Sequence, residues 1–410
     1  MSEGVNFDDS QIFVDLNNNS KVNQQERLEQ VRSAVEITRD AVKAVSITAI
    51  DLLKEIPSFM AGLDLEAELK NPFSHIEAPI WEEEMVPQEM IDAAYAYCEL
   101  LTKKEAGNFY HSLKYLPDDQ RRAMCAYYAF CRRADDIADG DYVDVFPGSD
   151  GAEDPEATDY RRSLEELTGD KSVLDAPTYR DKLAQLFFYR KKLSTAYNCN
   201  SSTDPIFMAL KDAVARFEVP REYLDDLISG MEDDLYTNRY RTFDDLYKYC
   251  YRVASTVGLA CIEIYDYEDP KAIEYAESWG IFMQLTNILR DVSEDAGRNR
   301  VYLPLDDLER HGIKASELST DLSNDKRWHA FVSEFIERIE VYHEKALKLL
   351  PLLNRKARYS PAAMMSFYAS ILKKIKKHDG NIFHGQIKLS KVEKVSLAAA
   401  VYIKQRFLRL

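Results

Sequence analysis

The chain has 410 residues, of which 46% are hydrophobic, and its formal net charge is −17 at pH 7. The hydrophobic content is ample for a sizeable core, and the acidic balance argues against nonspecific nucleic-acid binding. No Gly-x-Gly-x-x-Gly or Walker-type loop occurs, which weakens any interpretation based on a Rossmann fold or a P-loop. The six cysteines contain no C-x-x-C pair, so we expect reduced thiols in a cytoplasmic protein.

Residues 1–87 differ from the rest of the chain and are predicted to form an N-terminal extension. The first 25 residues are polar and acidic, which is typical of disorder and unlike a basic targeting sequence. Residues 26–55 carry apolar side chains at helical spacing, and a loop rich in proline and charge follows them. No chemistry is visible in this extension.

From Gln88 onward the pattern predicts one helix after another, separated by breaks that contain proline or glycine. Strand-like alternation is nearly absent and no repeat period is visible, so residues 88–410 are predicted to form a single all-α domain. Residues 140–159 are polar and acidic, as expected of a surface loop. The predicted helices span residues 88–105, 118–139, 158–168, 176–197, 204–217, 221–229, 242–265, 269–295, 305–310, 325–351, 361–378 and 390–408.

The predicted helix 118–139 ends in the sequence CRRADDIAD. Asp135 and Asp139 are spaced by four residues and share one helix face with Arg132, where the two like charges repel. Two interpretations are open: a solvated charged face with an Arg132–Asp136 ion pair, or a cation site. The opposite, core-facing side is expected to hold Ala123, Tyr127, Phe130 and Ala134.

The predicted helix 269–295 combines an apolar stretch with a polar stripe. Residues 278–291 are apolar over most of the helix circumference, which indicates burial. Polar groups in a buried helix need partners, and oxygen ligands without His or Cys favour Mg²⁺, with Mn²⁺ as the alternative. The stripe consists of Gln284, Asn287, Asp291 and Asp295.

Electrostatics indicates what such a site would hold. A carboxylate and a phosphate oxygen about 4 Å apart repel by roughly 4 kcal/mol at an effective dielectric constant of 20. An acidic site therefore holds a diphosphate only with divalent cations, which neutralise the leaving group, and with arginines that clamp the remaining oxygens. The candidate arginines are Arg132, Arg290, Arg298 and Arg300.

The segment between these helices, residues 230–259, brings Tyr249 and Arg252 as polar groups. It then continues with small or β-branched residues, which either leave space for an elongated apolar ligand or allow close helix–helix packing. These residues are Thr256, Val257, Gly258 and Ala260.

Several segments carry a family resemblance. YYAFCRRADDIAD, YCYRVASTVGL and QLTNILRDVSEDAGRNRVYLP resemble the signature segments of the phytoene/squalene synthase family. GNFYHSLKYLP resembles the opening motif of that family, and residues 368–394 resemble its closing segment. The resemblance, over roughly residues 90 to 395, implies the all-α class I terpenoid synthase fold, an isoprenoid synthase with helices around a central cavity.

The resemblance also implies roles for individual residues. Metal binding would come from Asp135 and Asp139 on the first Asp-rich helix and from Asn287, Asp291 and Asp295 on the second. The four aspartates and Tyr249 would be catalytic. Contacts to diphosphate would come from Asn108, Arg132, Gln284, Asn287, Arg290 and Tyr368. Two positions depart from the family pattern: Asn108 stands where Ser is frequent, and Gln386 where Arg is expected, with Lys388 close by.

The implied reaction joins two identical prenyl diphosphates head to head. The leading prediction is phytoene from two geranylgeranyl diphosphates, which requires no NADPH. The alternative is presqualene diphosphate, squalene or dehydrosqualene from farnesyl diphosphate, with NADPH needed only for squalene. A bulky Phe109 or Leu113 would shorten the cavity. Two other classes, a non-catalytic assembly factor of the same fold and a terpene cyclase, have less support because every motif aspartate and the Tyr249 segment are present.

The C-terminal segment is locally basic in an otherwise acidic chain. Charge-free stretches such as residues 278–289 are too short to span a membrane, and the chain ends in the amphipathic sequence VSLAAAVYIKQRFLRL. One interpretation is peripheral attachment of a cytoplasmic protein to anionic lipid, and the other is a terminal helix packed on the core with a solvated basic side.

Overall fold

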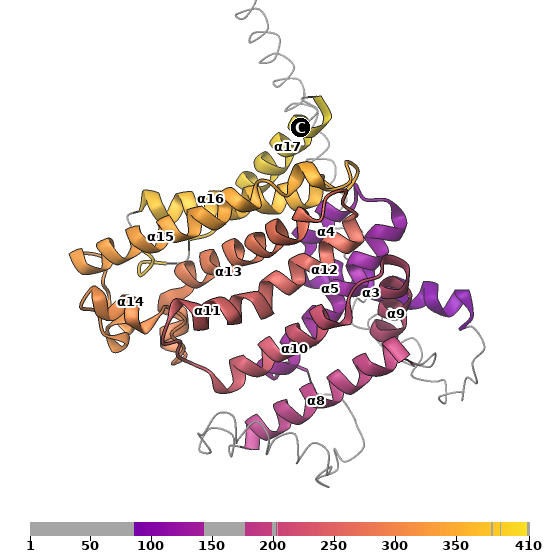
Figure 1. Cartoon of the computed structure of the whole chain (residues 1–410), viewed down its shortest axis with the longest axis horizontal. Coiled ribbons are helices and arrows are strands. Elements are labelled where there is room, and N and C mark those ends of the chain that lie inside the picture. The colour runs from indigo at the N-terminus through magenta and orange to yellow at the C-terminus, as the bar shows by residue number, and fades with distance from the viewer. Residues whose placement is uncertain are drawn as a thin grey trace, which may run out of the picture. The chain divides into compact units, whose positions relative to one another are not determined.

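The computed structural model describes residues 86–142, 177–198, 202, 204–378, 380–385 and 387–407 (Figure 1). The expectations for residues 1–85, for the helix at 158–168 and for Gln386 lie outside these ranges. The backbone of Asn108 is described, but its side chain is not.

The described residues are helical and contain no strand; two isolated bridges pair Arg239 with Val301 and Tyr267 with Leu353. The α-helices are α3 (Gln88–Glu105), α4 (Gly107–Leu113), α5 (Asp118–Asp139), α8 (Pro177–Asn198), α9 (Pro205–Phe217), α10 (Arg221–Tyr236), α11 (Phe243–Cys250), α12 (Thr256–Tyr265), α13 (Lys271–Gly297), α14 (Leu305–Arg310), α15 (Lys326–Ala346), α16 (Tyr359–Lys377) and α17 (Lys391–Phe407). A π-helical turn, η1 (Tyr251–Ser255), joins α11 to α12, and short 3₁₀ turns cover Ala315–Ser319 and Leu350–Leu352.

The all-α prediction is confirmed, and most helices begin and end within a few residues of the predicted bounds. Three differences matter. Helix α4 was not predicted, because it begins with the poor helix formers Gly107 and Asn108. Helix α10 continues beyond Gly230, because Met231 and Leu235 extend its buried stripe. The helix predicted at 242–265 is divided by η1, and π-turns of this kind frequently lie at functional sites.

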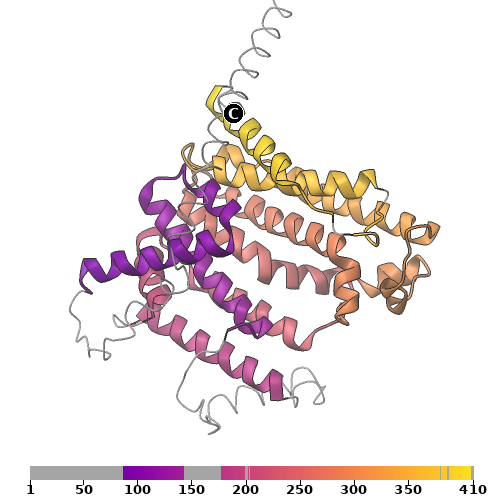
Figure 2. The same ribbon diagram turned by 180° about the vertical axis from the view of Figure 1, so that it is seen from behind.

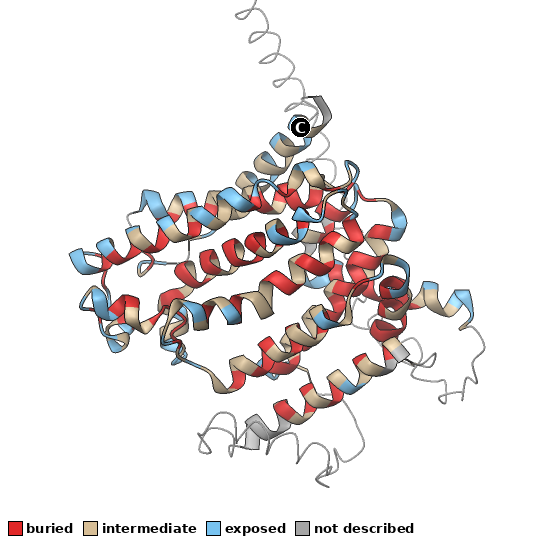
Figure 3. Cartoon of the chain, in the orientation of Figure 1, coloured by how far each residue is buried: buried red, intermediate tan, exposed pale blue. Residues whose placement is uncertain are grey.

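Helix α13 lies at the centre of the described helices. It packs against α15, η1, α12 and α16 (Figure 1), while α5 packs against α3, α9, α8, α10 and α12. Seen from behind, α3, α4 and α5 lie in front, in indigo and purple (Figure 2). Buried residues run along α13, α12 and α5 (Figure 3), whereas none of the described residues of α17 is buried. The core therefore surrounds the two helices that carry the aspartate pairs.

Glycines allow close approach between the central helices. A Cβ atom on Gly280 of α13 would lie 2.4 Å from the Cα of Ser255, and one on Gly258 of α12 would lie 3.1 Å from the carbonyl oxygen of Ala276. Thr256 and Ala260 are fully buried. Thr256, Gly258 and Ala260 thus serve close helix packing, whereas Val257 is only partly buried, and space for an apolar ligand beside it stays a prediction.

Replacing Gly280 with alanine is expected to lower the free energy of unfolding by about 3 kcal/mol or more, because the new methyl group would overlap the backbone of η1. Gly297→Ala is the matched control in the same helix. Nothing lies within 4 Å of a Cβ atom there, so alanine is expected to be neutral or to stabilise by about 0.5 kcal/mol. Urea unfolding measures both; equal stability of the two variants would contradict the close approach.

Candidate functional site

The charged side of α5 is built around Arg132. Its guanidinium donates to Asp135 at 3.0 Å and forms an ion pair with Asp136 at 2.5 Å. The Asp135 side chain is about half exposed and Asp139 is exposed. Burial, and then the nearby charge of Asp139, raise the pKa of Asp135. The predicted core side of the helix is confirmed, since Ala123, Tyr127, Phe130 and Ala134 are all buried.

The polar stripe of α13 lies on the less buried side of that helix. Gln284, Asn287, Arg290, Asp291 and Asp295 are all partly buried. The remaining circumference is buried, as predicted, and consists of Ile281, Phe282, Leu285, Ile288, Leu289 and Val292. The stripe is therefore the part of this helix segment that solvent reaches.

Asn287 connects α13 to α16. Its amide nitrogen lies 3.5 Å from the hydroxyl of Tyr368, at the outer limit of a hydrogen bond. The side-chain oxygen of Asn287 is buried and has no hydrogen-bond partner among the residues that the structure describes. A buried polar atom without a partner is costly, so this oxygen is a natural ligand for a cation. Two residues predicted to contact diphosphate, Asn287 and Tyr368, are thus brought together.

Arg290 binds the carboxylate of Asp291 with two nitrogen atoms. Its Nε donates to one oxygen at 2.8 Å, and a terminal nitrogen donates to the other oxygen. In the ligand-free structure, arginines therefore cover aspartates on both helices, Arg132 on α5 and Arg290 on α13. Each arginine occupies the position where a cation would otherwise balance the carboxylate.

Asp295 lies one turn beyond Asp291. Burial and the adjacent charge of Asp291 raise the pKa of Asp295 to about 6. Such an elevated pKa is typical of a functional carboxylate, and here it comes first from burial and second from the charge of Asp291.

Arg300, one of the candidate arginines, lies among groups from several elements. Burial lowers the pKa of Arg300, but the neighbouring Tyr302, Asp234, Asp139 and Tyr249 raise it overall. Arg300 thus interacts with the end of α5 and with α10. Arg298, by contrast, is mostly exposed and pairs with Glu294 at 2.9 Å, away from the stripe.

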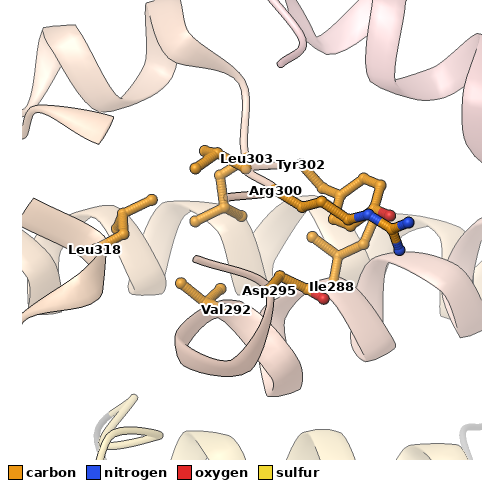
Figure 4. A pocket seen from close by; sticks show the side chains of 8 residues that line it. Ile288, Val292, Asp295, Arg300, Tyr302, Leu303 and Leu318 are labelled. Atoms are coloured by element: carbon orange, nitrogen blue, oxygen red, sulfur yellow. The ribbon is translucent and has the colours of Figure 1, made fainter. Parts of the chain in front are cut away.

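A small pocket adjoins this end of α13. It is lined by Ile288, Val292, Asp295, Arg300, Val301, Tyr302, Leu303 and Leu318. Figure 4 shows Asp295, Arg300 and Tyr302 on one side of the pocket and Leu318 on the other. Its enclosed volume of about 10 Å³ is far below the roughly 300–1,000 Å³ typical of small-molecule sites. The pocket therefore forms only part of any site for a long substrate.

Tyr249 belongs to a network that sequence reasoning missed. The Tyr249 hydroxyl donates to one carboxylate oxygen of Asp234 at 3.0 Å, and the Tyr302 hydroxyl donates to the other at 2.9 Å. Asp234 was missed because α10 was predicted to end at residue 229, so the sequence EDDLY was not assigned to a helix. Met231 and Leu235 continue the apolar spacing of α10, and this signal could have placed Asp234 on the helix.

The predicted metal ligands are all oxygen donors, which suits Mg²⁺. Among the described residues, however, no three acidic, histidine or cysteine side chains are close enough to hold a metal ion by themselves. Asp135 interacts electrostatically with Asp139, and Asp295 with Asp291. The donors thus form two pairs on separate helices rather than one preformed cluster, and a bridging anion would be needed to use both pairs together.

A family model described as squalene/phytoene synthase matches residues 102–393. The chain belongs to the squalene/phytoene synthase family. Among its relatives, the phytoene synthase of Mycobacterium tuberculosis is 33% identical over 312 residues, covering 76% of this chain and 91% of the relative. The 15-cis-phytoene synthase of Synechocystis is 32% identical, covering 73% of this chain and 81% of the relative.

Solved structures agree with this membership. A dehydrosqualene synthase in complex with ligand is 26% identical with a TM-score of 0.62, covering 78% of this chain and 99% of that one. The squalene synthase HpnC from Alicyclobacillus acidocaldarius, at 23% identity and a TM-score of 0.59, shares the fold and covers 73% of this chain and 98% of that one. This member of the squalene/phytoene synthase family is therefore a prenyltransferase with the predicted all-α terpenoid synthase fold.

Proposed function

We propose that the chain joins two geranylgeranyl diphosphates head to head and releases diphosphate to form phytoene. The observation that carries this proposal is the likeness to phytoene synthases at 32–33% identity over about three quarters of the chain. One aspartate of each pair, Asp135 on α5 and Asp291 on α13, is bound by an arginine, which supports the proposal. The proposed catalytic domain comprises residues 88–410, and residues 1–87 are an extension.

Asp135 and Asp139 of α5 and Asn287, Asp291 and Asp295 of α13 fit Mg²⁺ as oxygen ligands, and Mn²⁺ is the alternative. When bound, the ion neutralises the diphosphate leaving group. In the proposed mechanism the carboxylates would hold the ion, and with it the positive charge that balances the diphosphate. The remaining diphosphate contacts come from Asn108, Arg132, Gln284, Asn287, Arg290 and Tyr368.

Arg132 and Arg290 leave their aspartates to bind diphosphate oxygens, so positive charge is ready where the allylic C–O bond breaks. The resulting carbocation adds to the second prenyl chain, and loss of a proton gives a cyclopropylcarbinyl diphosphate. Its ionisation, rearrangement and loss of a second proton give phytoene. The buried apolar residues of α5 and α13 exclude water from the cations.

The alternative product class has thirty carbons and comes from farnesyl diphosphate. The likeness to a solved dehydrosqualene synthase favours it as the second candidate. NADPH would be a further substrate only if squalene were the product. The non-catalytic alternative is less favoured because both aspartate pairs are retained.

A single experiment separates these proposals. The purified full chain is incubated with Mg²⁺ and either geranylgeranyl or farnesyl diphosphate, with and without NADPH, and the hydrocarbon is identified by mass spectrometry. We expect phytoene from geranylgeranyl diphosphate without NADPH. A product from farnesyl diphosphate alone would replace the leading proposal with the alternative, and no product from either substrate would refute both.

We also propose that the protein is cytoplasmic and contacts a membrane peripherally through α17. No segment described as helical combines the length and the hydropathy that a bilayer-crossing helix requires. Helix α17 packs on α16, but one side of it remains open: Val392, Val395 and Tyr402 are 74%, 50% and 43% exposed. The basic residues of this region would favour anionic lipid over zwitterionic lipid.

The double substitution Val392→Asp and Val395→Asp is expected to lower co-sedimentation with vesicles containing phosphatidylserine by at least about fivefold, because it places two charges on the face that enters the lipid. The matched control is Val341→Asp on α15, since Val341 is also 54% exposed. Equal binding by the variant, the control and the unchanged chain would exclude α17 as the membrane contact.

A further inference from the structure

Asp234 is a partly buried carboxylate at which three parts of the chain meet. It belongs to α10, whereas Tyr249 belongs to α11 and Tyr302 follows α13. Its two oxygens accept separate hydrogen bonds, one from the Tyr249 hydroxyl at 3.0 Å and one from the Tyr302 hydroxyl at 2.9 Å. Both hydroxyl protons are therefore directed at the same carboxylate.

The tyrosine rings are held by one another as well as by Asp234. The rings of Tyr249 and Tyr302 stack with their centroids 5.2 Å apart, and the ring of Tyr240 lies 5.2 Å from the first and 5.8 Å from the second. Ring packing thus fixes where each phenol lies, and Asp234 fixes where its proton points. A phenol whose proton is committed in this way presents oxygen lone pairs in its remaining directions.

This network borders the site on α13. Tyr302 and Asp295 line the same pocket together with Arg300 (Figure 4). Arg300 also interacts electrostatically with Asp234, Tyr249 and Asp139. Burial raises the pKa of Asp234 to about 6, while Arg300 and the two tyrosine hydroxyls oppose the rise, so the carboxylate remains mostly ionised at neutral pH.

We infer that Asp234 is a positioning residue that acts through Tyr249, fixing the hydroxyl so that the phenolic oxygen presents its negative end to the cation formed when diphosphate leaves. A fixed dipole aimed at developing charge stabilises a transition state more than the ground state, so kcat should depend on Asp234 more than KM does. This inference rests on the proposed prenyl transfer.

The test compares Asp234→Asn with Asp233→Asn, using whichever prenyl diphosphate the unchanged chain converts. Asparagine keeps one acceptor oxygen and the side-chain shape but removes the second acceptor and the charge. Asp233 is a matched control because it precedes Asp234 on α10 and, like Asp234, accepts two side-chain hydrogen bonds. These come from Arg252 at 2.7 Å and from Tyr236 at 2.8 Å. We expect Asp234→Asn to lower kcat by about 10- to 100-fold with KM changed by less than about threefold. Asp233→Asn should stay near the unchanged chain.

A double-mutant cycle with Tyr249→Phe separates positioning from a purely structural role. If Asp234 acts through Tyr249, the variant Asp234→Asn with Tyr249→Phe should be no slower than Tyr249→Phe alone. Losses that multiply would overturn the inference, as would an active Asp234→Asn.

If circular dichroism shows that Asp234→Asn does not fold, Tyr302→Phe takes its place. Tyr302→Phe keeps the Asp234–Tyr249 hydrogen bond, so a loss of turnover as large as that of Tyr249→Phe would contradict the inference. An unchanged chain without any product would overturn the proposed function and this inference together.

Discussion

Replacing Asp291 with alanine is expected to lower turnover by at least about 10³-fold, because the leaving diphosphate loses the carboxylate that anchors its counter-charge. Asp291 lies in the middle of the polar stripe, its side chain is 20% exposed, and both of its oxygens are in use in the ligand-free structure. No other carboxylate on α13 has the same relation to Arg290. Product formation from geranylgeranyl diphosphate at saturating Mg²⁺ measures the loss.

The matched control is Glu294→Gln, which removes one negative charge three residues further along the same helix. Glu294 is 43% exposed and pairs with Arg298 at 2.9 Å, outside the stripe. Its loss is expected to change turnover by less than about twofold, because surface ion pairs contribute little. Both variants should keep the helical circular dichroism spectrum. Substantial turnover by Asp291→Ala would show that the second aspartate pair does not hold the diphosphate.

Replacing Asp295 with asparagine is expected to have two opposite effects. Turnover should fall by about 10²- to 10³-fold, because a ligand of the leaving group's cation is lost. The metal-free protein, however, should become more stable by about 1 to 2 kcal/mol at pH 8, because an ionised carboxylate that burial and Asp291 disfavour is removed. This gain would show that the ionised carboxylate of Asp295 lowers the stability of the metal-free protein.

The pH dependence of the stability gain of Asp295→Asn follows from the raised pKa of Asp295. The pKa of Asp295 is about 6 in the folded chain against an ordinary value of 3.8. Between these values the folded state holds a proton that the unfolded state has lost, so the stability contributed by this group falls as pH rises towards 6. Above pH 6 the penalty is complete. The advantage of Asp295→Asn should therefore be largest above pH 6 and should shrink as pH falls towards 4.

Urea unfolding of the metal-free chain at pH 5 and pH 8 measures this effect. Glu294→Gln again serves as the control; because Glu294 is a smaller cause of the raised pKa of Asp295 than burial and Asp291 are, its gain should be smaller. An Asp295→Asn variant that is less stable than the unchanged chain at pH 8 would contradict the elevated pKa of Asp295. A gain that is equal at both pH values would show that the effect does not come from ionisation.

Most of the fold was predictable because helical spacing and chain breaks are local properties. Helix α5 begins and ends where its apolar spacing and Asp-rich end predicted. The spacing of Asp291 and Asp295 also indicated a shared face correctly. Helix α4 was missed because its sequence, GNFYHSL, begins with glycine and asparagine, which are poor helix formers.

The site was predictable only where one helix contributes its residues. The network of Asp234, Tyr249 and Tyr302 joins three elements that are far apart in sequence, and only tertiary packing brings them together. The pairing of Arg290 with its neighbour Asp291 likewise depends on side-chain conformation, which spacing does not determine. Chain length of the substrate depends on the volume between helices, which follows from packing rather than from motifs.

The arginines that cover the aspartates have a consequence for the order of binding. Asp135 and Asp291 are paired with Arg132 and Arg290, and the exposed charge of Asp139 would repel a diphosphate that comes without a cation. With both ligands present, Asp135 and Asp291 would hold the cation, and the two guanidinium groups would be free to bind phosphate oxygens. The two ligands are therefore thermodynamically coupled: each should raise the affinity of the other, by about 5- to 150-fold for a coupling free energy of about 1 to 3 kcal/mol.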